Sequence, residues 1–233
     1  MGNMRTCRTG ITRCGLCLLG LWGLRYVPSA AGLELAEGEL RITPRITAGS
    51  VSWDELRTRG GHKSTAGLGV NADYVRERTG LGLDVWYWHV SEGLDSNEGV
   101  IPKSAFRIGA DLRRLFPVKD DLTWYPYIGL AYETWNRDRP PPDTRTYWES
   151  LDFLTATVGA GLTYDKAYAK LGVSQSFMAK ADRGDDPNGR VGFESEVGMR
   201  LRPLSLGLFW RGNGFQNPDT KLIHAGMFLG YEF

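Results

Sequence analysis

The segment 220–233 reads TKLIHAGMFLGYEF, and its pattern guides the interpretation of the rest of the chain. Counting back from the last residue, every second side chain is apolar: Phe233, Tyr231, Leu229, Met227, Ala225 and Ile223. The intervening positions are mostly small or polar: Glu232, Gly230, Phe228, Gly226, His224 and Leu222. Because a β-strand alternates its side chains between two faces, the segment predicts a strand with one apolar and one mixed face.

The composition supports strands of this kind throughout the chain. Its 233 residues include 30 glycines and 12% aromatic residues, and the formal net charge is +1. Beyond the N-terminal segment, the absence of a run of 18 or more apolar residues excludes a helical membrane protein. The near-neutral charge gives no indication of a nucleic-acid partner.

Residues 1–31 have the features of a secretory signal peptide. A basic start with Arg5, Arg8 and Arg13 precedes the short apolar stretch GLCLLGLWGL at 15–24, and small residues follow at 29–31. We expect cleavage after Ala31, with Ala30 as the alternative. Cys7, Cys14 and Cys17 all lie in this segment, so the mature chain is predicted to have no disulfide and no thiol nucleophile.

The remaining chain, 32–233, is predicted to form one all-β domain. Alternation recurs in ten segments of about 11 to 15 residues, which suits strands tilted across a membrane. The segments are 40–53, 64–76, 80–92, 104–116, 122–136, 150–164, 166–180, 189–202, 204–214 and 220–233. Merging two weak neighbours would give eight strands, and the first segment is the weakest because it contains Pro44.

The connections alternate between tight and long. The tight ones are 77–79, 117–121, 165 and 203, and the longer polar ones are 54–63, 93–103, 137–149, 181–188 and 215–219. This alternation is typical of an antiparallel up-and-down transmembrane barrel, with short turns in the periplasm and longer loops outside. Glycines at 67, 69, 159, 161 and 172 fall on the predicted inner face, where they would leave gaps that water could fill.

Each strand can be assigned an apolar outer face and a charged inner face. Leu81, Leu83, Val85 and Tyr87 form one outer set, and similar sets occur at 106–112, 122–132 and 191–201. In a soluble sandwich the charged face would face water, whereas in the favoured membrane barrel it must line a polar lumen, because lipid cannot solvate charge. The predicted lumen-lining charges are seven basic and seven acidic residues: Arg41, Arg45, Asp73, Asp84, Arg107, Asp111, Arg113, Glu133, Lys170, Glu194, Glu196, Arg200, Arg211 and Glu232. In particular, Asp84 and Asp111 are expected to form salt bridges with Arg107 and Arg113 rather than to act as an acid–base pair.

With these features in place, the chain resembles the small outer-membrane β-barrels of Gram-negative bacteria, a class that includes OmpA-type barrels and narrow porin-like channels. The terminal Phe233 on an alternating strand is similar to the assembly signal of that class. The stretch 124–133, WYPYIGLAYE, is similar to its PY-x-G-x-x-Y strand. The resemblance implies export to the outer membrane, contact with the bilayer and lipopolysaccharide, and recognition of the last strand by the barrel-assembly machinery.

The predicted function is non-enzymatic, that of a porin-like or structural barrel without cofactor, metal or nucleic-acid partner. One alternative is a lipid hydrolase, because His89 and Ser91 resemble the His-x-Ser motif of outer-membrane phospholipase A and lipid A deacylases. Glu92 departs from that motif, which has Asn after the Ser. A second alternative is an adhesion barrel with aromatic loops around Trp135, Tyr147 and Trp148.

Metal binding is not predicted. His62 and His224 have no metal-ligand spacing, and Asp182, Asp185 and Asp186 are more typical of a solvated loop than of a cation site.

Overall fold

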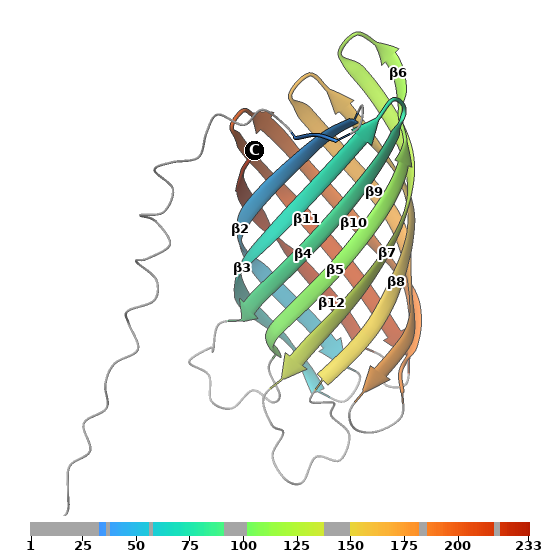
Figure 1. The fold of residues 1–233 in the computed structure, drawn as a ribbon. Coiled ribbons are helices and arrows are strands. Elements are labelled where there is room, and N and C mark those ends of the chain that lie inside the picture. Colours follow the sequence, from blue (N-terminus) through green and yellow to red (C-terminus); the bar gives the residue numbers. More distant parts are fainter. Residues whose placement is uncertain are drawn as a thin grey trace, which may run out of the picture. The chain divides into compact units, whose positions relative to one another are not determined.

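Ten β-strands form the wall of a closed barrel in the computed structural model (Figure 1). The model describes residues 33–35, 38–55, 58–90, 102–137, 150–181, 186–216 and 220–233. The wall strands are β2 (Gly38–Glu55), β3 (Thr58–Arg76), β4 (Thr79–Val90), β5 (Pro102–Arg114), β7 (Leu122–Arg137), β8 (Ser150–Tyr164), β9 (Ala167–Ala181), β10 (Asn188–Leu201), β11 (Leu204–Gln216) and β12 (Thr220–Tyr231). Two short strands, β1 (Leu33–Leu35) and β6 (Phe116–Lys119), pair with the ends of β2 and β7. No α-helix in the described ranges is long and apolar enough to cross a bilayer.

The last strand closes the barrel on the first. Every wall strand pairs antiparallel with its neighbour in sequence, and β12 pairs with β2 from Thr220↔Glu55 to Gly230↔Arg45. Beyond β12, the backbone N–H of Phe233 donates to the carbonyl oxygen of Ile42 at 3.0 Å. The predicted antiparallel up-and-down barrel of ten strands is therefore confirmed, and the eight-strand alternative is wrong.

The two ends of the barrel differ in their connections. At the short-turn end, Glu77 and Asp165 start two-residue turns with φ angles of 52° and 48°, and a third turn joins β10 to β11. The opposite end, here called the long-loop end, carries the connections 56–57, 91–101, 138–149, 182–187 and 217–219, of which all but 186–187 lie outside the described residues. The predicted signal peptide also lies outside them.

One predicted loop is wrong. Residues 54–63 were expected to form a loop, but β2 and β3 remain paired as far as Glu55↔Thr58. The sequence there is polar on both faces, so the apolar alternation that marks a strand disappears. Backbone pairing needs no such alternation, and the hairpin therefore continues beyond the apolar part of the wall.

The outer wall is apolar over all ten strands. Leu83, Tyr87 and Ile128 are 49%, 52% and 58% exposed, and the outer faces predicted from the sequence are confirmed. Trp124, Tyr164 and Tyr231, all exposed, occur near strand ends, as in the aromatic girdles of membrane barrels, whereas the exposed Trp210 lies at the middle of β11. An apolar surface that surrounds the barrel is far larger than the patches that soluble monomers expose, so the wall faces lipid.

Candidate functional site

The interior of the barrel, its lumen, holds the charged side chains singled out in the sequence. All fourteen predicted lumen charges are buried or half-buried, and they alternate along their strands with exposed apolar residues. Most of them lie in the middle of the lumen and toward the short-turn end. The lumen divides into three zones: a central ion-pair network, an apolar zone at the long-loop end and an open cavity at the short-turn end.

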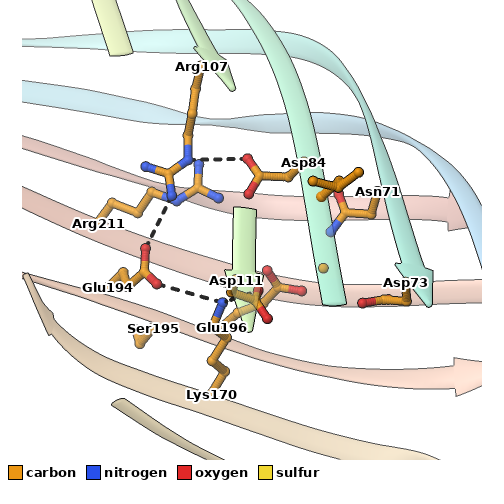
Figure 2. A pocket seen from close by; sticks show the side chains of 12 residues that line it. Asn71, Asp73, Asp84, Arg107, Asp111, Lys170, Glu194, Ser195, Glu196 and Arg211 are labelled. Atoms are coloured by element: carbon orange, nitrogen blue, oxygen red, sulfur yellow. Dashed lines mark hydrogen bonds and ion pairs between the residues drawn. The ribbon is translucent and has the colours of Figure 1, made fainter. Parts of the chain in front are cut away.

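Arg107 is the centre of the ion-pair network (Figure 2). Its Nε donates to Asp84 Oδ2 at 3.2 Å, its Nη1 to Glu133 Oε2 at 3.3 Å and its Nη2 to Glu194 Oε2 at 3.3 Å. The three carboxylates come from the two strands beside β5 and from β10, which lies across the barrel. The planar guanidinium thus uses all three of its nitrogens to link opposite walls.

Further pairs cross the lumen beside this centre. Lys170 on β9 lies 3.0 Å from Asp111 on β5, and it also lies 3.7 Å from Glu194. Arg45 on β2 donates to Glu196 on β10 at 2.9 Å. Tyrosines add to the network: the hydroxyl of Tyr127 donates to Glu194 and that of Tyr168 to Glu196.

Arg113 pairs with Asp73 two strands away and lies 3.9 Å from Asp111. The expected salt bridges of Asp84 with Arg107 and of Asp111 with Arg113 are therefore present. Together with the pairs that cross the lumen, these contacts join opposite walls at the middle of the barrel.

A small cavity of about 50 Å³ remains inside the network. Arg107 and Arg211 both point into it (Figure 2). Arg211 Nη1, Asn71 Oδ1 and Asp111 Oδ1 are buried without a hydrogen-bond partner among the described residues. A polar cavity of this size has room for water, which could pair with these atoms, but not for an organic solute.

The long-loop end of the lumen is mainly apolar, although Lys63 is also buried there, which corrects the expectation of a uniformly polar lumen. Twelve buried residues, here called the aromatic plug, fill it: Val51, Trp53, Trp86, Trp88, Val90, Ala105, Trp135, Leu151, Phe153, Ala179, Phe215 and Leu222. Trp86 stacks on Trp88 with ring centroids 5.7 Å apart, and Phe153 meets Phe215 edge-on at 4.9 Å. Trp135, expected among the external loop aromatics, is 0% exposed within this plug.

His224 connects the plug to the network. Its ring meets Trp88, Trp135 and Phe209 edge-on, at centroid distances of 4.8, 5.7 and 5.0 Å. Its Nε2 lies 3.1 Å from the hydroxyl of Thr65. Packed in this way, the imidazole is a buried structural group, in keeping with the absence of a metal-ligand spacing in the sequence.

The inner-face glycines do not leave open gaps, which is a second correction. A Cβ at Gly67 or Gly69 would collide with the indole of Trp88 or Trp86 on the neighbouring strand. Likewise, a Cβ at Gly161 would collide with the ring of Tyr125. The glycines therefore make room for large rings that lie flat along the inner wall.

The sequence carried a signal for the plug. Along β4 the inner face runs Asp84, Trp86, Trp88, Val90, so the charged face becomes apolar toward the long-loop end. Along β7, Glu133 is followed two residues later by Trp135. The change from charged to apolar side chains is visible when the inner face is followed residue by residue along each strand. It is lost when whole faces are sorted by charge.

At the short-turn end, a cavity of about 640 Å³ opens between the network and the turns. We call it the vestibule. Its charged lining residues are Glu39, Arg41, Asp73, Arg113, Asp165, Lys166, Arg200 and Arg202. Arg41 donates to Glu39 at 2.7 Å, and the Arg200 guanidinium lies 5.1 Å from the centre of the Tyr168 ring. The Arg202 side chain is 72% exposed and lies 3.8 Å from Glu39 and 3.7 Å from Glu232.

The remaining candidates for chemistry are not brought together in the part of the chain that the structure describes. His89 is exposed on the outer wall, and Ser91 lies outside the described residues. His62 is exposed, and Asp186 accepts a backbone hydrogen bond from Ala181 at 3.2 Å. Asp182, Asp185, Tyr147 and Trp148 lie outside the described residues. Within those residues, no three His, Cys, Asp or Glu side chains are arranged to hold a metal ion.

Comparison with known proteins finds similarity in solved structures alone. No protein-family model matches the chain, and no curated protein matches it. Solved structures that resemble it include Neisserial surface protein A (12% identity, 82% of this chain and 97% of that one, TM-score 0.39). Others are the outer membrane protease OmpT from Escherichia coli (10%, 83% and 97%, TM-score 0.47) and the attachment invasion locus protein Ail of Yersinia pestis (7%, 83% and 98%, TM-score 0.40). These identities are too low to transfer a function.

The class of protein follows from the chain's own features. In a closed antiparallel barrel each wall strand pairs with two neighbours and no sheet edge is left open, which a membrane requires. Its outer wall is apolar, while charged side chains fill the middle of its lumen. The protein is an outer-membrane β-barrel.

Proposed function

We propose that the protein is a sealed, non-enzymatic outer-membrane barrel that anchors its loops and its vestibule, rather than an open porin. Of the porin-like and structural roles expected from the sequence, this proposal selects the structural one. The observation that carries it is the double closure of the lumen. The Arg107 network crosses the middle of the barrel, and the aromatic plug fills the long-loop end.

The two closures act on different solutes. The network presents fixed charges that already have partners, so a polar solute entering it would have to break buried ion pairs. The plug presents closely packed indole and phenyl rings, which exclude hydrated ions. A solute small enough to pass one closure is therefore stopped by the other.

Conductance tests the proposal directly. The full chain is expressed in a Gram-negative host, and the barrel is extracted from its outer membranes and inserted into planar bilayers. Folding is checked by the shift in gel mobility on heating. We expect no discrete conductance steps from the folded native barrel. Reproducible steps would refute the sealed lumen and favour a porin.

A paired variant separates the closures. Trp88→Ala with Trp135→Ala should empty the centre of the plug and still remain silent, because the ion-pair network is intact. The matched control is Tyr87→Ala with Tyr132→Ala, which removes two exposed rings from the same strands. Steps in the first variant and not in the second would show that the plug is the sole closure.

The non-enzymatic part of the proposal has its own assay. Native barrel and the Ser91→Ala variant are mixed with phospholipid and with lipid A, and released fatty acid is measured. We expect no release from either protein. Release that is present in the native barrel and lost in Ser91→Ala would establish the hydrolase instead.

A further inference from the structure

We propose that the vestibule is a binding site for a small solute carrying at least two negative charges, as phosphate or carboxylate groups. The inference goes beyond the sealed barrel and rests on it in one respect, because the closed lumen makes the vestibule a blind pocket. A solute would enter and leave by the short-turn end, which the sequence pattern predicts to face the periplasm.

The size of the vestibule suits a small molecule. Its volume of about 640 Å³ lies within the range of roughly 300–1,000 Å³ that is usual for small-molecule pockets. The small cavity inside the network, at about 50 Å³, is too small for such a solute. The vestibule lining also includes Tyr125 and Leu115, which would contact the uncharged part of a bound molecule.

The charge of the lining favours an anion. Five of the eight charged lining residues are arginine or lysine, and three are acidic. Glu232, at 3.7 Å from Arg202, partly offsets this excess. Four of the five cations are arginines, whose planar guanidinium groups pair with phosphate and carboxylate in a bidentate manner.

The cations are not equally able to bind a ligand. Arg113 is held by Asp73 at the floor of the vestibule, and Arg41 is held by Glu39. Arg202 has a side chain that is 72% exposed, and its two ion pairs are long, at 3.7 and 3.8 Å. The Arg200 guanidinium lies over the Tyr168 ring at 5.1 Å, a contact that positions the group through its planar face. Arg200 and Arg202 are therefore the residues we expect to contact the ligand.

A free solute fits this site better than a lipid headgroup. The vestibule lies inside the closed wall, and the backbone hydrogen bonds between neighbouring strands separate it from the bilayer. A headgroup could reach only the rim, where Lys166 and Arg202 lie in the turns. A free solute and a lipid headgroup carry the same phosphate chemistry, so the experiment includes a separate measurement for each.

The test measures binding of inorganic pyrophosphate by calorimetry. The full-chain protein, extracted from outer membranes, is placed in nanodiscs of zwitterionic lipid. We expect saturable binding of one pyrophosphate per barrel that weakens as salt is raised. Arg200→Gln and Arg202→Gln should each weaken it about tenfold, the loss expected for one charge-assisted hydrogen bond. Absence of saturable binding to the native barrel would overturn the proposal.

The chain offers a matched control on the same rim. Arg114 is exposed at the short-turn end but faces outward, where it donates to the hydroxyl of Thr79 at 3.1 Å. Arg114→Gln removes the same charge at the same end and should leave pyrophosphate binding unchanged. An equal loss in Arg114→Gln would show that binding reflects net charge alone and would overturn the site.

Two further measurements distinguish a free solute from a lipid headgroup, and the vestibule site from the sealed lumen. If nanodiscs containing phosphatidylglycerol abolish pyrophosphate binding, the phosphate belongs to a headgroup and the free-solute assignment is wrong; we expect binding to persist. The same preparation is tested for conductance. A silent barrel that does not bind refutes this inference alone, while a conducting barrel that binds refutes the sealed lumen and retains the site.

Discussion

Replacing Arg107 tests whether the central network stabilises the barrel. The Arg107→Gln variant keeps a polar side chain of similar length but removes the positive charge shared by Asp84, Glu133 and Glu194. The arginine is 7% exposed and Glu133 is 3% exposed, so water can take little part in compensating for the loss. Three carboxylates would then lie close together without their common partner, and the folded state should be strongly destabilised.

The magnitude follows from the contacts. Arg107 makes three charge-assisted hydrogen bonds, at 3.2, 3.3 and 3.3 Å. At about 1.5–3 kcal/mol each, their sum would exceed 4 kcal/mol, but bonds that share one side chain are not additive. Removal of one partner from a buried ion pair usually lowers stability by about 3–5 kcal/mol, and we expect a loss in the free energy of unfolding within that range.

The assay is equilibrium unfolding in urea, followed by tryptophan fluorescence and by gel mobility. Arg114→Gln, on the same strand but exposed, is the control and should change stability little. The double variant Arg107→Gln with Glu133→Gln should recover part of the loss, because it also removes one unpaired carboxylate. A loss below about 1 kcal/mol for Arg107→Gln, comparable to that of an exposed ion pair, would refute the reasoning.

Three other predictions concern packing and closure. Trp88→Ala should lower the free energy of unfolding by about 3–5 kcal/mol through the cavity it leaves, whereas Tyr87→Ala, on the lipid face, should have a smaller effect in the same urea titration. Gly161→Val should lower it by about 1–3 kcal/mol or more, because the new side chain displaces the Tyr125 ring; an unchanged midpoint would contradict the ring-over-glycine packing. Deleting Phe233 removes its 3.0 Å hydrogen bond to β2 and should reduce the amount of folded barrel recovered from outer membranes, measured by gel mobility.

The sequence alone determined the wall of the barrel. Each strand of a membrane barrel contacts lipid on one face and the lumen on the other, so a period of two is imposed on nearly every residue of the wall. Leu81, Leu83, Val85 and Tyr87 could be assigned outward because lipid excludes charge along the whole strand. The strand number followed from the same pattern, which missed the polar hairpin at 54–63 and the short strand β6, placed within the predicted connection 117–121.

The contents of the lumen were decided by the tertiary structure. Arg107 pairs with carboxylates from strands that are far apart in sequence, as its pair with Glu194 shows. Alternation assigns a residue to the inner or outer face, but it does not identify the residue on the opposite wall. The plug depends in the same way on rings from many strands meeting at one level, with glycines such as Gly67 and Gly69 making room for them. The local sequence pattern shows which face of the strand a residue occupies. The partners of that residue are determined by the closure of the barrel, because strand tilt and register decide which residues of opposite walls lie at the same height along the barrel axis.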